Sequence, residues 1–396
     1  MTRRPVLFTL MILSLSGCWN DPQSQTAASS YAITTLLLDP GRCSTDISTN
    51  RVDCSVVYAA TAGNGVFKSE DGGTSWSRQV NGLFEWNITV LAMDPKDAMT
   101  LYAGTENNGL FRTSDGGTIW SNAGSAGAIR SITAIAIDPH TCQFPPCTEI
   151  YVGSEESGVW VSRDRGLSWA QMNNGLPPGE GTIVTALTVS SYNKSPSDLY
   201  AGTEGGHLYK LDRSKIPNEW KEDLPGLSEK TTASPLVIAV NPITPSELYV
   251  GTSGGEGEST GGTFRSVDAG LNWNVVPIPN AQNFSVRVLT FCLQVEPRCP
   301  PTVPDTADPP ENDDLREENI LYAGVYGLSI TPLPALPGGL WTNLFSSTSD
   351  VMIGNNVSSL AIDTLRHTTL YAGTLLGFVI KSQDAGATWE RIDINL

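Results

Sequence analysis

Short apolar stretches alternate with polar turns along most of the chain, and their order repeats. Each copy of the repeat opens with an apolar run that ends in Asp-Pro, as at residues 88–95 and 132–139. A second run carries Leu-Tyr-Ala-Gly-Thr or a near copy, and a Gly-containing turn leads to a third run. Short apolar runs bounded by turn residues are typical of buried β-strands, so the pattern predicts strands without helices.

The Tyr-Ala-Gly-Thr phrase sets the period of the repeat. Successive copies are separated by 44, 49, 49, 49, 73 and 49 residues. A regular period near 50 indicates a repeat architecture that covers nearly the whole chain. The tyrosines that open the phrase are Tyr58, Tyr102, Tyr151, Tyr200, Tyr249, Tyr322 and Tyr371.

A second motif, S-x-D-x-G-x-x-W with Thr in place of Ser once, follows the third run in five copies. Its hydroxyl and carboxylate side chains suit hydrogen bonds to the backbone of a tight turn, and its Gly supplies a positive φ. The fourth copy keeps Asp212 and Trp220 at another spacing, and the sixth, around residues 328–341, has lost the motif. The five Asp and Trp pairs are Asp71 and Trp76, Asp115 and Trp120, Asp164 and Trp169, Asp268 and Trp273, and Asp384 and Trp389.

The indole is the larger energetic contribution of this motif. Burying about 200 Å² at roughly 25 cal/mol/Å² is worth at most ~5 kcal/mol, against ~1 kcal/mol for each turn hydrogen bond. We therefore expect the Trp to anchor the turn and the Asp to shape it.

These motifs resemble Asp-box repeats, also called BNR repeats, of sialidases, sortilin-type receptors, xyloglucanases and photosystem II assembly propellers. Four short strands per copy also match a propeller blade. The expected fold is all-β: a single seven-bladed β-propeller of four-stranded antiparallel blades over residues 31–396. Because the first copy begins with its own inner strand, we expect ring closure by side-chain packing of residues 31–39 against the last blade.

The first residues predict export. A basic start, an apolar run from Val6 to Leu15 and small residues before Cys18 describe a signal peptide over residues 1–17. The Leu-Ser-Gly-Cys end resembles the bacterial lipoprotein cleavage box, which implies lipidation of Cys18 and a flexible tether over residues 18–30. The expected location is the bacterial cell envelope, at the outer membrane because Trp19 replaces the usual retention signal. An ordinary signal cut elsewhere is the alternative.

The other six cysteines fall in sequence-local pairs in the loop between the first two runs of a copy. Loops on different blades disfavour cross-pairing, so three local disulfides of about 2–3 kcal/mol each are expected in an oxidising compartment. A zinc site is the alternative, but His140, His207 and His367 are far apart in the repeat. The predicted pairs are Cys43 with Cys54, Cys142 with Cys147, and Cys292 with Cys299. The last pair opens a Pro-rich acidic insertion, residues 292–319, expected to be an extended or disordered flap.

The chain is strongly acidic. Its formal net charge is −17, and it becomes −19 without Arg3 and Arg4, with 22 Lys and Arg against 41 Asp and Glu. Such a surface repels nucleic acid and anionic lipid, so we expect the protein to contact the membrane through its lipid alone. The acidity also favours a basic protein partner. The alternative is that the negative charge serves only to keep the protein soluble.

Acidic residues gather in the turns that follow the Tyr-Ala-Gly-Thr phrase. Antiparallel strands place these turns on one face, where propeller ligands usually bind. Carboxylates there suit a basic segment of a partner or, as a possible cofactor, Ca²⁺, although no dense calcium loop is present and plain solvated turns are the alternative. The candidate binding face is Glu106, Glu155, Glu156, Glu204, His207, Glu256, Glu258, Arg287, Phe84 and Trp86.

Three of these residues are special cases. Arg287 replaces a small side chain at the second position of the first run. Its guanidinium has two interpretations: it forms a structural ion pair with the carboxylates, or it holds a substrate. Phe84 and Trp86 lie between the first two copies and form an adhesive patch or fill a gap.

The repeat family includes enzymes, but their catalytic residues are not evident here. The Phe-Arg-Ile-Pro element of sialidases is absent, and Arg112, Arg163 and Arg265 belong to the repeat itself. Xyloglucanases of this type use two facing propellers, and the basic binding face of the photosystem assembly propellers is missing. The expected function is a monomeric binding or scaffold module for a protein or surface glycan, without an assigned catalytic residue or metal site. A glycoside hydrolase is the alternative.

Overall fold

The computed structural model describes most of the repeat region. For residues 43–46, 51–54, 292, 320, 325, 327–332 and 342–343 it describes the backbone only. The described ranges are 31–39, 43–46, 51–54, 56–124, 129–141, 149–177, 183–190, 197–213, 217–222, 225–228, 230–254, 261–276, 278, 285–292, 320–325, 327–332, 342–343, 357–363, 369–384 and 386–394.

The strands pair into four-stranded antiparallel sheets, each from one continuous stretch of chain. Short apolar runs separated by turns can only pair with their neighbours in sequence, which gives this meander order. Six of the sheets are β1 (Ile33–Leu38), β4 (Val57–Thr61), β5 (Gly65–Ser69), β6 (Ser77–Gln79); β7 (Ile88–Asp94), β8 (Asp97–Thr105), β9 (Leu110–Thr113), β10 (Ser121–Asn122); β11 (Ile132–Ile137), β12 (Ile150–Ser154), β13 (Gly158–Ser162), β14 (Ala170–Gln171); β15 (Val184–Val189), β16 (Leu199–Thr203), β17 (His207–Asp212), β18 (Glu219–Glu222); β19 (Pro235–Val240), β20 (Leu248–Thr252), β21 (Thr263–Ser266), β22 (Asn274–Val275); and β27 (Val357–Ile362), β28 (Leu370–Thr374), β29 (Val379–Ser382), β30 (Glu390–Ile392).

The expected number of seven equivalent blades is corrected to six complete ones. In the six sheets above, every strand is described with its side chains. The strands β23 (Val288–Cys292), β24 (Ile320–Val325), β25 (Gly327–Pro332) and β26 (Thr342–Asn343) pair in the same order, but β25 and β26 are described by their backbone alone. The physical reason for the difference lies in the sequence: this copy keeps Trp341 directly before β26 but lacks the Ser and Asp whose hydrogen bonds shape the turn before the fourth strand elsewhere.

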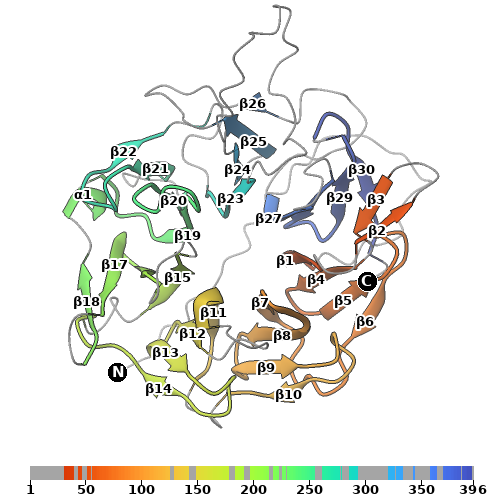
Figure 1. Ribbon diagram of the computed structural model, residues 1–396, viewed down its shortest axis with the longest axis horizontal. Coiled ribbons are helices and arrows are strands. Elements are labelled where there is room, and N and C mark those ends of the chain that lie inside the picture. The colour runs from red at the N-terminus through yellow and green to blue at the C-terminus, as the bar shows by residue number, and fades with distance from the viewer. Residues whose placement is uncertain are drawn as a thin grey trace, which may run out of the picture.

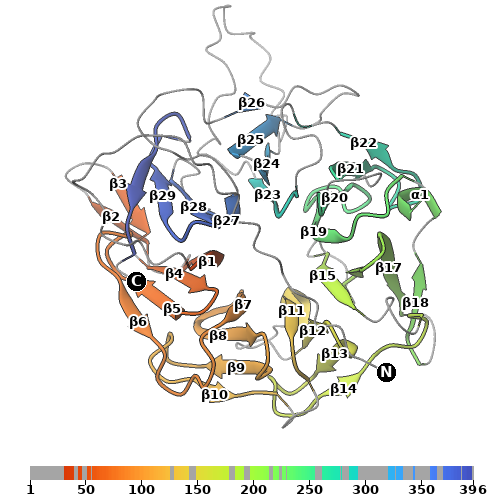
Figure 2. The same ribbon diagram turned by 180° about the vertical axis from the view of Figure 1, so that it is seen from behind.

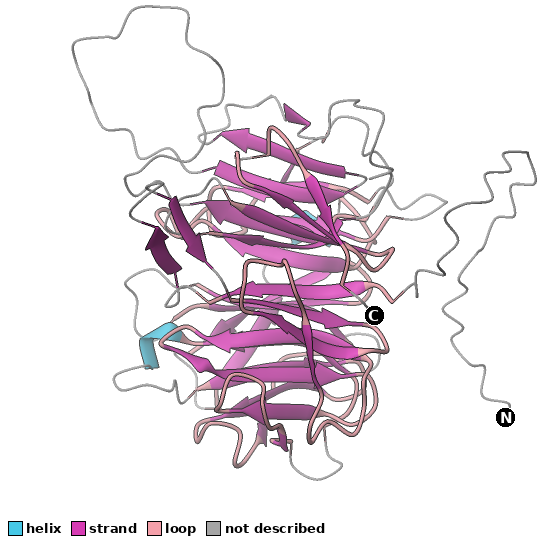
Figure 3. Ribbon diagram, turned by 90° about the vertical axis from the view of Figure 1, so that its right-hand side faces the viewer, coloured by secondary structure: helices cyan, strands magenta, loops and turns pink. Residues whose placement is uncertain are grey.

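The sheets stand around a common centre like the blades of a propeller (Figures 1 and 2). The first strand of each sheet is innermost, and the short fourth strand lies at the outer edge. Seen from the side, the strands run between two faces (Figure 3). We call the face with the turns between second and third strands the turn face, and the face with the S-x-D-x-G-x-x-W turns the box face.

The glycine of the repeated phrase makes room for the next blade. A Cβ on Gly104 would lie 2.6 Å from Cγ2 of Ile132, and one on Gly153 would lie 2.5 Å from Cγ1 of Val184. Both partners are the first residue of the next inner strand. Since Cβ atoms never approach this closely, the glycine is required for blade-to-blade packing.

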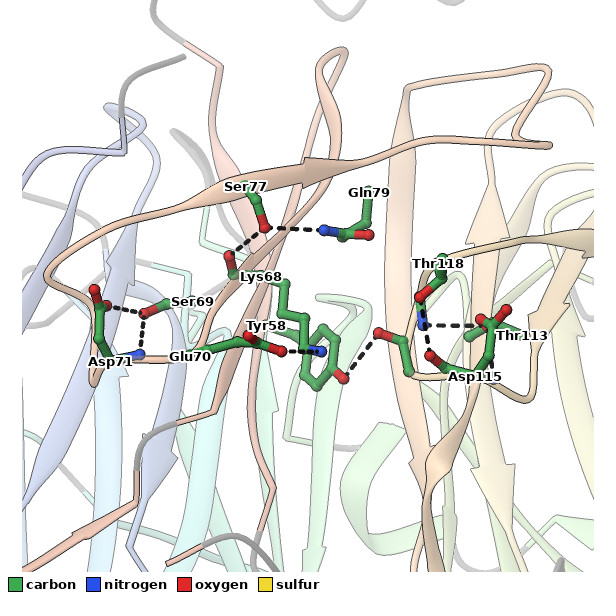
Figure 4. A network of polar contacts seen from close by, with 12 residues as sticks. Tyr58, Lys68, Ser69, Glu70, Asp71, Ser77, Gln79, Thr113, Asp115 and Thr118 are labelled. Atoms are coloured by element: carbon green, nitrogen blue, oxygen red, sulfur yellow. Dashed lines mark hydrogen bonds and ion pairs between the residues drawn. The ribbon is translucent and has the colours of Figure 1, made fainter.

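The tyrosine of the phrase also contacts the next blade. Tyr58 is buried and donates its hydroxyl hydrogen bond to the Gly116 carbonyl, at 3.0 Å, in the neighbouring box turn (Figure 4). Lys68, paired with Tyr58 across the strands, lies over its ring at 5.8 Å from the centroid. Burial raises the pKa of Tyr102 to about 12, which keeps that phenol neutral at physiological pH.

The box tryptophans pack against the preceding blade, as the expected anchoring role requires. Trp120 is 2% exposed, and its indole N–H donates to the Gln79 carbonyl at 3.2 Å. Trp169 donates in the same way to Ala123 at 2.6 Å. Trp220, in the copy with altered spacing, is equally buried and donates to Met172 at 2.6 Å. The indole therefore keeps its position even where the surrounding motif has degenerated.

Ring closure occurs by side-chain packing, as expected. The first and last sheets each consist of strands from one end of the repeat region. Ile33 and Leu36 of β1 share a buried cluster with Ala361 and Val379 of the last blade. The Tyr371 hydroxyl donates to the Gly72 carbonyl at 3.0 Å, so the last blade contacts the first in the way that Tyr58 of the first blade contacts the second.

Outside the blades, β2 (Cys43–Asp46) and β3 (Arg51–Cys54) form an antiparallel hairpin in which the backbone of Cys43 lies opposite that of Cys54. The two short helical segments are η1 (Pro139–Thr141) and α1 (Pro225–Ser228). Within the described part of the chain, no helix has the length and apolarity to cross a membrane.

All seven cysteines, including Cys18, lie outside the residues whose side chains are described, as does the signal segment, so the disulfide and lipidation predictions stay predictions.

Candidate functional site

The box turns use their polar groups internally. In the turn of β13 and β14, the Ser162 hydroxyl donates to Asp164 at 2.8 Å and accepts from the Gly166 N–H at 2.7 Å. Asp164 accepts from the Ser168 N–H at 2.8 Å. Hydrogen bonds from Ser168 hold the pKa of Asp164 below its usual value. These carboxylates are committed to the fold and are poor candidates for ligand binding.

Residue combinations that resemble a sialidase centre are also part of the fold. Glu247 accepts from the Tyr249 hydroxyl at 3.0 Å and from Arg265 Nε at 2.7 Å. The Tyr249 side chain is fully buried, so its oxygen is inaccessible to a substrate. Arg163 similarly pairs with Glu149 at 3.1 Å, and Arg112 lies over the Tyr102 ring at 6.0 Å. These repeat arginines therefore pair with or cover groups of their own blades.

On the turn face, three consecutive blades carry a glutamate at the same register. The Glu106 N–H donates to Asn87, Glu155 to Ser131 and Glu204 to Ile183, with N–O distances of 3.2, 3.1 and 3.0 Å. Each acceptor directly precedes the inner strand of its blade. The shared bond places all three exposed carboxylates beside the starts of innermost strands. Glu106, Glu155, Glu156 and Glu204 are called the acidic arc below.

The members of the acidic arc repel one another. Partial burial raises the pKa of Glu155, and the negative charges of Glu106, Glu156 and Glu204 raise it further. The structure thus brings together four of the six glutamates that the sequence assigned to this face. Among the described residues, the charged groups that act on Glu155 are all acidic, and such a concentration of negative charge favours a cationic ligand.

The aromatic patch, Phe84 and Trp86, borders this arc. Phe84 is 81% exposed and Trp86 is 47% exposed. Glu85 between them accepts hydrogen bonds from the backbone N–H groups of Asn107 and Asn108, each at 2.9 Å. This clamp holds the two aromatic residues against the turn that carries Glu106.

Further contacts fix the orientation of the patch. The Arg78 guanidinium lies 4.2 Å from the Trp86 ring centroid, and the Phe84 ring lies 6.1 Å from the buried ring of Phe111. Asn87 donates to the Glu106 carboxylate, which joins the patch to the arc. Side chains that are held rigidly while they remain exposed are suited to recognition rather than to core packing.

Two predicted site residues, His207 and Arg287, lie apart from this assembly. His207 Nδ1 lies 2.7 Å from the Glu222 carboxylate in β18, so it belongs to the outer edge of its blade. Arg287 precedes β23, and no carboxylate among the described residues pairs with it, so the expected ion pair is not found. Glu256 and Glu258 lie outside the described residues.

The inner strands carry small hydroxyl residues at their second positions, and the structure shows what these hydroxyl groups do. The ladders of six inner strands slip at the second residue, which forms a β-bulge, as at Thr89 and Thr133. The Thr133 hydroxyl donates to the Val184 carbonyl of the next blade at 2.6 Å. The Ser358 hydroxyl lies within hydrogen-bond distance of the Ile33 and Gly373 carbonyls, across the ring junction. The recurrence of small hydroxyl residues at this position was the sequence signal that could have predicted these hydrogen bonds.

The chemistry that this face offers is binding of a cation beside an apolar surface. The described residues include no cluster of three or more His, Cys, Asp and Glu arranged to hold a metal ion. The arc can attract an ammonium or guanidinium group, and the aromatic patch can cover its aliphatic stem.

Neither a family model nor a curated protein matches the chain. Solved structures do match, at low identity. A GH74 xyloglucanase from Xanthomonas campestris has a TM-score of 0.64 and 17% identity over 93% of this chain and 55% of its own. The extracellular domain of BT4673 from B. thetaiotaomicron has a TM-score of 0.58 and 14% identity over 90% of this chain and 38% of its own.

A smaller protein is similar over nearly its whole length. The structure titled YCF48 bound to D1 peptide has a TM-score of 0.53 and 14% identity, over 89% of this chain and 93% of its own. This chain spans only about half the length of the xyloglucanase, at 55%. Identities at this level establish the fold alone: the chain is an all-β propeller with four-stranded blades.

Proposed function

We propose that this protein is an exported binding module that holds a basic segment of a partner protein on its turn face, at the bacterial cell envelope and anchored through lipidated Cys18. The observation that carries the proposal is the junction of the aromatic patch with the acidic arc. Exposed rings next to repeat-registered carboxylates provide both apolar and electrostatic contact for Lys and Arg side chains. A surface glycan is the other ligand class for the same rings.

The neighbouring structures are compatible with this proposal. YCF48 was solved with a peptide, so a propeller of this size accommodates a peptide ligand in at least that case. The long-range field of a chain with net charge −17 also speeds the approach of a cationic partner at low salt.

A titration with acetylated, amidated octalysine tests the proposal. The double variant Glu155→Gln with Glu204→Gln should weaken binding about 5- to 30-fold at low salt, since each lost ionic contact is worth about 0.5–1 kcal/mol. The matched control, Glu70→Gln with Glu390→Gln, removes two exposed charges elsewhere and should change affinity less than ~3-fold. Equal losses in both variants would reduce the effect to net charge and overturn the proposal.

The second candidate function is a glycoside hydrolase. The raised pKa of Glu155 favours it, because a carboxyl that holds its proton longer than its neighbours is what a general acid requires. Assays on a panel of sialosides and β-glucans distinguish the two functions. Turnover that disappears in Glu155→Gln would establish the hydrolase and displace the binding module.

The anchor is tested separately. Incorporation of a fatty-acid analogue into the wild-type chain, and none into Cys18→Ser, is the expected result. Labelling of neither chain would remove the lipid anchor from the proposal and leave the binding face intact.

A further inference from the structure

The exposed indole of Trp86 already carries a cation of the chain itself. The Arg78 guanidinium lies 4.2 Å from the Trp86 ring centroid, within the range of a cation–π contact. The backbone of Trp86 is fixed, because its carbonyl accepts hydrogen bonds from the N–H groups of Gly63 and Gly65 at 3.1 and 2.8 Å. Trp86 is still 47% exposed with this contact in place, so its ring is held at the surface with a cation beside it.

The third blade shows what the fold alone requires at the position of Arg78. Arg78 and Gln171 occupy the same place in the fourth strands of the first and third blades. Arg78 Nε donates to the Asn64 carbonyl at 2.8 Å, and Gln171 Nε2 donates to the Ser157 carbonyl at 2.9 Å. Each of these carbonyls belongs to the residue directly before the third strand. A neutral amide therefore satisfies the turn, and the charge of Arg78 is not needed for it.

The last blade has an arginine at the same position in a different setting. Arg391 donates from Nε to the Asp393 carboxylate at 2.6 Å and lies over Phe378, a ring that is only 7% exposed. Arg78 forms no ion pair with a carboxylate of the described residues. Arg391 is thus neutralised over a buried ring, whereas Arg78 keeps its charge over an exposed one.

We propose that Trp86 is a binding platform for an arginine side chain of the partner, and that Arg78 occupies this place in the free protein. Planar guanidinium groups stack on aromatic rings, a geometry that the ammonium group of lysine lacks. Asn87, the next residue, donates to the Glu106 carboxylate, so the platform is continuous with the acidic arc. The partner's arginine displaces Arg78 from the ring while neighbouring basic side chains contact the arc. This inference rests on the proposed function and names the side chain that is recognised.

Binding of acetylated, amidated octaarginine and octalysine to the full chain tests the platform. Arg78→Gln removes the cation and should keep the hydrogen bond to the Asn64 carbonyl, because Gln171 makes the equivalent bond. Arg391→Gln is the matched control, since it removes the same charge at the same position of another blade. We expect Arg78→Gln to raise the affinity for octaarginine about 2- to 5-fold more than Arg391→Gln does, with a smaller gain for octalysine.

The same substitution in a Trp86→Leu background separates stacking from charge repulsion. If Arg78 competes for the ring, its removal gives no gain in octaarginine affinity once the ring is absent. An equal gain in both backgrounds would mean that Arg78 acts through its charge alone, and it would overturn the proposal, as would the lack of any gain. Equal gains for octaarginine and octalysine would overturn the assignment to arginine.

A second measurement applies if Trp86→Leu does not fold. The indole N–H NMR signal of Trp86, assigned by its loss in Trp86→Phe, gives the same decision. A shift on addition of octaarginine that is larger than the shift with octalysine supports the platform, and an unchanged signal contradicts it.

The acidic-arc variant separates failure of this inference from failure of the proposed function. If Glu155→Gln with Glu204→Gln lowers the affinity but Arg78→Gln gives no gain, the arginine platform is removed and the proposed function stands. If the arc variant loses no affinity but Arg78→Gln shows a gain that depends on Trp86, the platform is supported and the arc is removed from the binding face.

Discussion

The two faces of the propeller treat their repeated carboxylates in opposite ways. On the box face, Asp164 is surrounded by donors, and hydrogen bonds from Ser168 lower its pKa. On the turn face, Glu155 is partly buried among other glutamates, and its pKa is raised. Both residues recur in register with the repeat, so recurrence alone does not identify a site. The difference in hydrogen-bond satisfaction separates the face that builds the fold from the face that is open to a ligand.

The largest expected contrast is between a box tryptophan and the exposed phenylalanine of the turn face. Trp120→Ala should lower the free energy of unfolding by about 3–5 kcal/mol, because it removes an indole that is 2% exposed and fills a gap between blades. Phe84→Ala, at a ring that is 81% exposed, should change it by less than about 0.5 kcal/mol. Chemical denaturation of both variants measures the contrast, and similar losses would mean that the patch is structural.

A smaller effect is expected at the box carboxylate. Asp164→Ala removes acceptors for the Ser162 hydroxyl and the Ser168 N–H and should cost about 1–2 kcal/mol. Because the folded-state pKa of Asp164 is lowered, its contribution is present above the unfolded pKa near 4 and is lost as the pH falls through the folded value. Thermal unfolding between pH 2 and 7 should show the difference between wild type and variant narrowing only below about pH 4. A difference that is independent of pH would contradict this role.

The bulge hydroxyls give a comparison within the inner strands. Ser358→Ala removes a hydrogen bond across the ring junction and should cost about 1 kcal/mol. The Thr185 hydroxyl is buried without a partner among the described residues, so Thr185→Val should be neutral or slightly stabilising. Denaturation midpoints of the two variants measure this directly, and an equal loss would show that β-bulge shape, rather than the hydroxyl, holds the junction.

The smallest expected effect, of opposite sign, is at Glu155. Its folded pKa is raised, so its ionised form destabilises the fold above that pKa, and the penalty disappears as the pH falls through it. Glu155→Gln should raise the Tm at pH 7 by about 1–2 °C and have no effect near pH 4. A lower Tm in the variant at pH 7 would show that Glu155 is a satisfied structural residue like Asp164.

Much of the fold follows from the repeat, and the exceptions have physical reasons. The Tyr phrase and the Trp motif predict four-stranded blades and packing-based closure because they report short local strands. The number of complete blades was overestimated, because the spacing of the repeated phrase counts a copy even where the Ser and Asp that shape its outer turn are missing. The glycine requirement at Gly104 depends on Ile132 of the next blade, 2.6 Å from its Cβ position, which no single copy reveals.

The candidate site was predicted in part. The turn glutamates were found because antiparallel order places such turns on one face. The clamp from Glu85 to Asn107 and Asn108, and the pairing of His207 with Glu222, depend on side-chain geometry between distant residues and left no sequence signal. The ion pair expected for Arg287 stays a prediction, since two of the expected partners, Glu256 and Glu258, lie outside the described residues.

Hydrogen–deuterium exchange of the full chain, with and without octalysine, tests most directly whether the turn face binds and the box face holds the fold. The account predicts slower exchange on binding at the backbone of Asn107, Asn108 and Glu156, and unchanged exchange at the box-turn glycines Gly117 and Gly166. Protection of the box turns, with none on the turn face, would contradict it.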